Sequence, residues 1–305
     1  MTEAVAAAED RAGDAADVRA WWQRHGLPGL FDVHVHFMAP AIQKAVWNVF
    51  EMAEHHPKLA RPWPIRYQIP EEDRIAFLRD AGVRRFSGLP YAHKPGVATF
   101  LNDWARSFAE RVPESLWSAT LYPEPEAPAY VAGLITEGVE VFKVHVQVGE
   151  FHLDDPLLDP VWGLLAEAAT PVVIHCGSGP MGNEYTGPAS LGRVLERHPH
   201  LQVIVAHLGA PEYAEFLALA DRFPAVRLDT TMAFTDFFDN IDPFPKDLLP
   251  RLADLGDRIL LGSDFPSIPY PLVHQLDALE GLGLGEEWLR AVCWDNCVAL
   301  FGDPG

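Results

Sequence analysis

The chain has 305 residues, of which 49% are hydrophobic and 22% charged, a composition typical of a globular protein with enough mass for a large core. A net charge of -20 argues against a nucleic-acid partner, because that affinity depends on clustered Lys and Arg. Met1 to Asp17 lacks the pattern of a secretion signal and no run is apolar enough to span a bilayer, so we expect a cytoplasmic protein without a membrane partner.

Residues 1-26 precede the first apolar run. We expect a mobile beginning, followed by a helix over Ala16 to His25 that closes the bottom of the domain. Residues 27-305 are expected to form a single domain. Within it, short apolar runs predict eight strands: Leu30 to Phe37, Arg84 to Pro90, Leu116 to Tyr122, Val139 to Gln147, Pro171 to Gly177, Leu201 to Leu208, Ala225 to Thr230 and Ile259 to Asp264.

Amphipathic stretches between these runs predict helices. They are Glu71 to Ala81, Gly96 to Val112, Pro128 to Glu137, Pro160 to Ala169, Ala189 to His198 and Glu212 to Phe223. Strands that alternate with helices indicate an α/β protein, and eight of them are most simply arranged as one closed (β/α)8 TIM barrel. An open doubly wound sheet is the alternative, but the Gly-rich phosphate loop typical of it is not found.

The segment at about 38-70 is too long for a plain connection between a strand and its helix. It carries Trp63 and Arg66 among other aromatic and basic residues. Because such loops lie on the catalytic face of a barrel, the insertion is either a cover for the substrate or a segment that packs against the rim.

Polar residues end several of the apolar runs, at the end where a barrel presents side chains to a substrate. They are His34, His36, Lys143, His145, His175, His207 and Asp264. In the run Val141 to Gln147, the polar residues alternate with apolar ones, so we expect the polar set to face the barrel interior. Imidazoles with a carboxylate suit one divalent metal, Zn²⁺ or alternatively Mn²⁺, Fe²⁺ or Co²⁺.

The strand-end motifs together resemble the amidohydrolase superfamily. The segments that carry the resemblance are Asp32 to Phe37, Lys143 to His145, His175 to Gly177, Ala206 to Gly209, Gly262 to Pro266 and Cys293 to Gly302. More narrowly, they are similar to the branch that includes aminocarboxymuconate semialdehyde decarboxylase and pyrone-dicarboxylate lactonase. The resemblance implies a TIM barrel of the metal-dependent hydrolase type.

The resemblance also implies roles for the strand-end residues. His34, His36, His175 and Asp264 would bind the metal, and Asp264 would also take a proton from water. His207 would orient or polarise the water or the substrate. Lys143 is either carboxylated in a two-metal site or, as the branch favours, a substrate or proton-transfer partner beside one metal.

Further residues are candidates for contact with a small-molecule substrate. Lys143 and His145 belong to the strand-end set, and Trp63 and Arg66 to the insertion. Arg61 and Arg66 offer bidentate geometry for a substrate carboxylate. His93 and Tyr185 follow predicted strands and are expected near the mouth of the site.

Three functions remain open on the sequence. The first is a metal-dependent hydrolase acting on a lactone, ester or amide of a small organic acid. The second is a metal-dependent, non-oxidative decarboxylase of an aromatic or unsaturated acid, and the third is an inactive barrel that only binds a ligand. The sequence also allows a homo-oligomer but does not define its symmetry.

Overall fold

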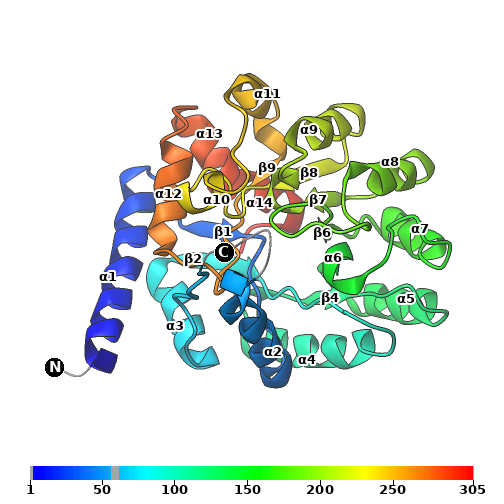
Figure 1. Cartoon of the computed structure of the whole chain (residues 1–305), viewed down its shortest axis with the longest axis horizontal. Coiled ribbons are helices and arrows are strands. Elements are labelled where there is room, and N and C mark those ends of the chain that lie inside the picture. Colours follow the sequence, from blue (N-terminus) through cyan, green and yellow to red (C-terminus); the bar gives the residue numbers. More distant parts are fainter. Residues whose placement is uncertain (1–2, 56–61, 305) are drawn as a thin grey trace.

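The computed structural model describes residues 3–55 and 62–304 and confirms a (β/α)8 barrel (Figure 1). All strand pairs are parallel, in the order of the chain. The strands are β1 (Leu30–Asp32), β2 (Val83–Ser87), β3 (Ser115–Leu116), β4 (Ser118–Thr120), β5 (Val141–His145), β6 (Val172–His175), β7 (Val203–Val205), β8 (Val226–Asp229) and β9 (Ile259–Leu260). β3 and β4 are two halves of the third predicted strand, separated at Trp117.

Helices surround the barrel and follow the strands much as the amphipathic pattern predicts. They are α1 (Glu3–Arg24), α2 (Pro40–Glu51), α3 (Glu71–Ala81), α4 (Ala98–Arg111), α5 (Ala127–Glu137), α6 (Val146–Gly149), α7 (Asp159–Ala168), α8 (Pro188–Arg197), α9 (Tyr213–Arg222), α10 (Asp236–Asp239), α11 (Leu249–Asp254), α12 (Leu272–Glu280), α13 (Glu286–Arg290) and α14 (Asn296–Phe301). Within the two described ranges, none of these helices is long and apolar enough to cross a membrane.

The barrel closes between the segments that follow β1 and β9. The amide of Val33 donates to the carbonyl of Leu261 at 2.9 Å, and the amide of Asp264 donates to the carbonyl of His34 at 2.9 Å. These bonds extend beyond the strands themselves. The residues that come after β1 and β9 are therefore fixed relative to one another.

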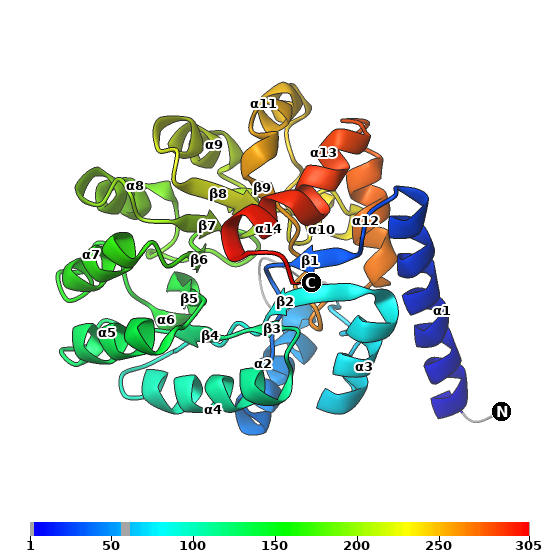
Figure 2. The same ribbon diagram turned by 180° about the vertical axis from the view of Figure 1, so that it is seen from behind.

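Alternate side chains of the strands fill the barrel interior. This interior cluster consists of Phe31, Val33, Leu89, Leu116, Val141, Val173, Ile204, Ala206, Leu260, Trp294 and Cys297. Trp294 belongs to a π-helical turn (Ala291–Asp295) that leads into α14, and Figure 2 shows α14 crossing the end of the barrel that faces the viewer there. The C-terminal segment therefore closes the bottom of the barrel.

The N-terminal helix lies elsewhere than the sequence predicts. α1 begins at Glu3, so the expected mobile beginning is largely helical, and it packs beside α3 and α12 on the outside of the barrel. Trp21 donates to Glu280 at 2.9 Å and Trp22 donates to the carbonyl of Ala81 at 2.9 Å. The expectation that this helix closes the bottom is wrong, because its two tryptophans dock on the ends of neighbouring helices instead.

The inserted segment contains a helix that the sequence did not predict. α2 lies over the end of the barrel seen in Figure 1, opposite the end that α14 closes. After α2, the chain returns through Trp63 and Tyr67, which are both buried. The hydroxyl of Tyr67 donates to the buried carboxylate of Asp14 on α1 and accepts from the amide of Leu272 at 2.8 Å. The end of the insertion is thereby tied to α1 and to the start of α12.

Aromatic packing between β1 and the C-terminal segment can be tested with Phe31→Ala. The ring of Phe31 is buried, with centroids 6.5 Å from Trp294 and 5.7 Å from Phe301. We expect the free energy of unfolding in urea to fall by about 3–5 kcal/mol, the usual cost of deleting a buried ring. Phe100→Ala makes the same change at a ring that is 55% exposed, and it should change stability by about 0.5 kcal/mol or less. Equal effects of the two variants would contradict this packing.

Candidate metal centre and its cavity

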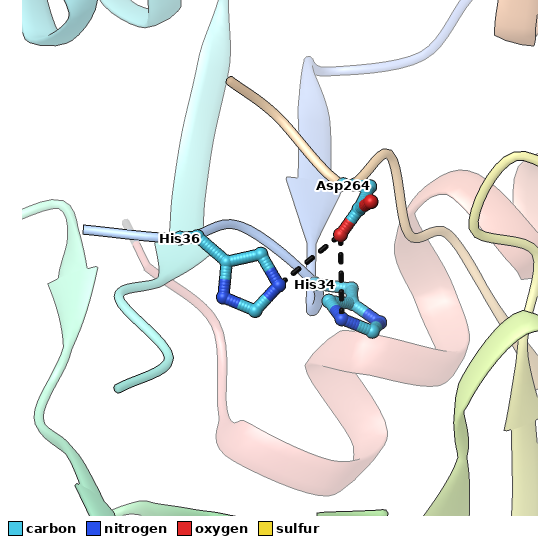
Figure 3. Close-up of side chains that lie close together, drawn as sticks. All are labelled: His34, His36 and Asp264. Atoms are coloured by element: carbon cyan, nitrogen blue, oxygen red, sulfur yellow. Dashed lines mark ion pairs between the residues drawn. The ribbon is translucent and has the colours of Figure 1, made fainter. Parts of the chain in front are cut away.

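Three side chains from the segments that close the barrel converge on one point (Figure 3). Oδ1 of Asp264 lies 3.1 Å from Nε2 of His36 and 3.7 Å from Nε2 of His34. All three residues are buried, and one ligand atom from each lies within 4.8 Å of the others. The structure therefore brings together three of the four residues expected to bind a metal.

Each imidazole of this cluster is held by its other ring nitrogen. Nδ1 of His34 donates to Oδ2 of Asp229 at 2.8 Å, and Nδ1 of His36 donates to the carbonyl of Leu89 at 2.8 Å. Because both partners can only accept, Nδ1 carries the proton in each neutral ring. Both rings therefore offer an unprotonated Nε2 to the point where Asp264 lies.

Asp229 is a site residue that the sequence analysis did not single out. It is fully buried, and besides holding His34 it accepts from the amides of His207 at 2.9 Å and Thr231 at 3.1 Å. The signal was present, since Asp229 is a polar residue near the end of a predicted strand. We interpret it as a positioning residue that orients the imidazole of His34.

A second carboxylate, Asp32, ties the two closing segments together. Its Oδ1 accepts from the amides of His34 at 3.0 Å and Ser263 at 3.2 Å. Burial raises the pKa of Asp32 to about 7, and the hydrogen bonds from Ser263 and His34 oppose that rise. The carboxyl group therefore fixes backbone on both sides of the cluster.

β7 and β9 end earlier than predicted because the chain turns sharply at their functional residues. His207 and Asp264 have φ values of 54° and 69°, in the left-handed region that side chains other than Gly rarely adopt. Gly262 allows the close approach here, since a Cβ at this position would lie 2.2 Å from Oγ1 of Thr231 and 2.9 Å from Cβ of His34. The turns direct His207 and Asp264 toward the barrel axis.

His175 lies beside the cluster, not within it. Its ring stacks on that of His145 with a centroid distance of 4.0 Å, and lies 4.7 Å from the ring of His207. Nε2 of His175 donates to the carbonyl of Gly179 at 3.3 Å. The role of His175 as a metal ligand therefore stays a prediction. The rings of His145, His175 and His207 lie side by side and form one wall of the site.

Burial keeps the imidazoles of this wall neutral. It lowers the pKa of His207 and of His34 well below the usual value, and lowers the pKa of His175 to about 3, with the nearby Lys143 charge acting in the same direction. Nδ1 of His207 donates to the carbonyl of Thr231 at 3.2 Å. A neutral His207 with its proton on Nδ1 can therefore accept a hydrogen bond at Nε2.

Lys143 lies at the floor of the site, as its position on β5 predicts. Its Nζ donates to Nε2 of His34 at 3.0 Å. Complete burial lowers the pKa of Lys143 to about 8, although the charges of Asp229 and Asp264 oppose the shift. The ammonium group thus lies against the candidate metal centre.

A cavity of about 370 Å³ opens above the cluster. The expected site residues that line it are His34, His36, Trp63, His93, Lys143, His145, His175, His207 and Asp264. Its other walls come from α2 and from the loops that follow β2, β5, β6, β8 and β9. The volume falls in the range of small-molecule sites, about 300–1,000 Å³.

Two predicted substrate contacts are not in the cavity. Arg66 forms ion pairs with Asp10 at 2.5 Å and with Asp14 at 3.6 Å, so its guanidinium is directed toward α1. Tyr185 packs against His152 with ring centroids 5.0 Å apart and does not line the cavity. Neither expected contact with the cavity is observed, because another side chain holds each residue elsewhere. Arg61 lies outside the described residues.

Tyr91 is a second cavity residue that the sequence analysis missed. Its ring lies 5.5 Å from that of His36 and 5.2 Å from that of His145. Burial raises the pKa of the Tyr91 hydroxyl, and the negative charge of Asp264 adds to this effect. The hydroxyl therefore keeps its proton. The only signal was its place after the second predicted strand, two residues before His93.

The donor set fits a divalent metal ion. Ligand atoms at about 2.0–2.1 Å from a tetrahedral Zn²⁺ lie about 3.3 Å apart, and the observed separations of 3.1 and 3.7 Å are close to this value. The hydrogen bonds on Nδ1 of His34 and His36 are those that metal-binding histidines usually make. The fold and site thus define a TIM-barrel protein with a candidate metal centre.

Comparison with known families agrees with this description. A model of the amidohydrolase family matches residues 31–302. The chain belongs to the amidohydrolase family, which the strand-end motifs predicted. No curated protein sequence matches the chain.

Solved structures share the fold at low sequence identity. An uncharacterised TIM-barrel protein from Bordetella bronchiseptica is 19% identical, with a TM-score of 0.71 over 91% of this chain and 99% of that one. The 2,6-dihydroxybenzoate decarboxylase from Rhizobium is 17% identical, with a TM-score of 0.64 over 90% and 99%. A 5-carboxyvanillate decarboxylase from Novosphingobium aromaticivorans, complexed with manganese and 4-hydroxy-3-methoxy-5-nitrobenzoic acid, is 16% identical, with a TM-score of 0.60 over 90% and 97%.

The positioning role of Asp229 can be tested with Asp229→Asn. Loss of the carboxylate that orients His34 should weaken zinc affinity about 10- to 100-fold, measured by competition with a chelator. Asp257→Asn removes a carboxylate from a side chain that is 82% exposed and should leave the affinity unchanged. Unaltered zinc affinity in a folded Asp229→Asn protein would show that His34 needs no such partner.

Proposed function

We propose that this protein is a metal-dependent hydrolase that acts on a lactone, ester or amide of a small organic acid. The observation that carries the proposal is the convergence of Nε2 of His34, Nε2 of His36 and Oδ1 of Asp264 at the floor of a cavity of small-molecule size. His34, His36 and Asp264 would hold one divalent ion, Zn²⁺ in the first instance, with His175 as a further ligand. When bound, such an ion lowers the pKa of a coordinated water from about 15.7 to about 7.

Asp264 is the proposed general base. Its Oδ1 faces the two histidines, and among the described residues no group donates a hydrogen bond to its Oδ2. Oδ2 is therefore free to take a proton from water as the water oxygen attacks the carbonyl carbon. The same proton can then pass to the leaving oxygen or nitrogen when the acyl bond breaks.

His207 and Tyr91 are the proposed partners of that reaction. His207 accepts at Nε2, so it can orient the attacking water by taking a hydrogen bond from it. Tyr91 keeps its phenolic proton and can donate to the carbonyl oxygen as negative charge develops there. Donor and acceptor are thus supplied by separate residues around one reacting centre.

Non-oxidative decarboxylation is the second candidate. Two of the structures that share the fold are decarboxylases of hydroxylated aromatic acids, one of them with manganese bound. Apart from a bound ion, however, the one cationic side chain among the described lining residues is Lys143, and its Nζ is already bonded to His34. A neutral carbonyl group needs no additional cation, which supports the hydrolase.

Separate roles for His36 and His207 can be tested by substitution. His36→Ala should lose bound zinc, because it removes a ligand atom, whereas His207→Ala should keep zinc and lose turnover about 100- to 10,000-fold. Metal content by elemental analysis and thermal unfolding would be measured on each purified variant. His200→Ala removes an exposed imidazole that does not line the cavity and serves as the control. Equal loss of zinc in both variants would make His207 a ligand.

The reaction class can be tested on the zinc-loaded protein with two panels. Lactones and esters should release acid, seen as a fall in pH, and hydroxybenzoates should release no CO₂. Removal of the metal with a chelator should abolish acid release, and added zinc should restore it. Release of CO₂ without hydrolysis would favour the decarboxylase, and a protein that takes up no metal would exclude both enzymes.

A further inference from the structure

One face of α2 lines the cavity with apolar side chains. They are Ile42, Ala45, Val46, Val49 and Phe50, called here the α2 wall. The spacing of three, four, seven and eight residues places all five on a single side of the helix. An apolar helix face usually packs on a protein core, and Ile42 and Phe50 do so in part, but all five side chains also line the space above the candidate metal centre.

A different side of α2 anchors the helix to the barrel. Oε1 of the buried Gln43 accepts from Arg74 at 2.9 Å, and the guanidinium of Arg74 lies 5.3 Å from the ring of Trp47. Val49 on the α2 wall is 59% exposed, an unusual exposure for a valine on the apolar face of a helix. Ile42 and Phe50 of the wall also pack on neighbouring core side chains, whereas Val49 stays open for contact with a bound molecule.

The side chains around the α2 wall are also apolar. Trp63 is fixed by a hydrogen bond from its Nε1 to the carbonyl of Ser267 at 2.8 Å, and its ring centroid lies 5.2 Å from that of Phe50. Met181, Met232 and Phe238 line the cavity as well. The polar groups of the candidate metal centre lie at the floor, and although His93 and Gln147 also line the cavity, its body is largely apolar.

The charged side chains that line the cavity also lie at its floor and not on the α2 wall. Lys143 is the only Lys or Arg among the described lining residues, and its Nζ is bonded to His34 at the floor. None of the five side chains of the α2 wall is charged. A second anionic group packed against the α2 wall would therefore lose its water without gaining a Lys or Arg partner there.

We propose that the substrate has an uncharged apolar body, a ring or a short alkyl chain, that packs against the α2 wall while its carbonyl group lies at the floor. The carbonyl group in this inference rests on the proposed hydrolase function. The apolar contact with the α2 wall concerns binding alone and does not depend on the reaction. A cavity of about 370 Å³ accommodates a small molecule and not a segment of another protein. The exposed side chain of Val49 offers that body an apolar contact and no hydrogen-bonding group.

Direct binding of non-hydrolysable probes tests the wall apart from the reaction. The probes are benzyl alcohol and its 4-methyl, 4-ethyl and 4-propyl derivatives, with 4-(hydroxymethyl)benzoate as the charged member, titrated into the zinc-loaded protein by calorimetry or NMR. Each added methylene buried against the wall should tighten binding about two- to fourfold. The charged probe should bind at least about tenfold more weakly than the 4-ethyl compound.

Two variants that add one negative charge at adjacent positions localise the effect. Val49→Asp should remove most of the gain from the propyl chain, and because Val49 is 59% exposed the protein should still fold. Asn48→Asp adds the same charge next to the wall but outside the cavity lining, and should leave the series unchanged.

Three results would overturn the inference: a flat series, tighter binding of the charged probe, or equal effects of the two variants. Each of these is independent of turnover. A normal series together with no hydrolysis of any ester or lactone would support the wall and contradict the proposed function.

Discussion

The closure of the barrel between the segments after β1 and β9 is the contact on which the site depends. Backbone hydrogen bonds join Val33 to Leu261 and Asp264 to His34, and the carboxylate of Asp32 accepts from amides on both sides. Residues more than 200 positions apart in the chain are thereby held within hydrogen-bonding distance. A shift in that contact would separate the imidazoles from Asp264, so the same bonds that complete the fold also assemble the candidate metal centre.

Several buried polar groups around this contact are hydrogen-bonded to one another. Asp229 accepts from Nδ1 of His34 and from the backbone amides of His207 and Thr231, which fixes the direction of the His34 imidazole and the backbone that carries His207. Low dielectric surroundings strengthen such bonds and make an unpaired group costly, so the network tolerates few alternative arrangements. The left-handed backbone at His207 and Asp264 is retained within this network. The result is a rigid polar floor beneath walls that are largely apolar.

Much of the fold and of the floor could be predicted from local patterns. Alternation on β5 placed Lys143 and His145 on the interior face, and the helix Glu71–Ala81 has the predicted bounds. The errors concern segments whose partners lie far away in the chain. The docking of Trp21 and Trp22 decided where α1 lies, and Asp10 and Asp14 drew Arg66 away from the cavity. Such contacts leave no periodic signal in the sequence.

By itself, the sequence determined the family, the strand order and which residue types end the strands, because periodicity and short motifs are local properties. Only the tertiary structure decided which of those residues meet. It joined His34, His36 and Asp264, set His175 against His145, and added Asp229 and Tyr91 to the site. It also directed the apolar face of α2 toward the cavity. The physical reason is that distances between side chains depend on how the barrel closes, and no single segment specifies that closure.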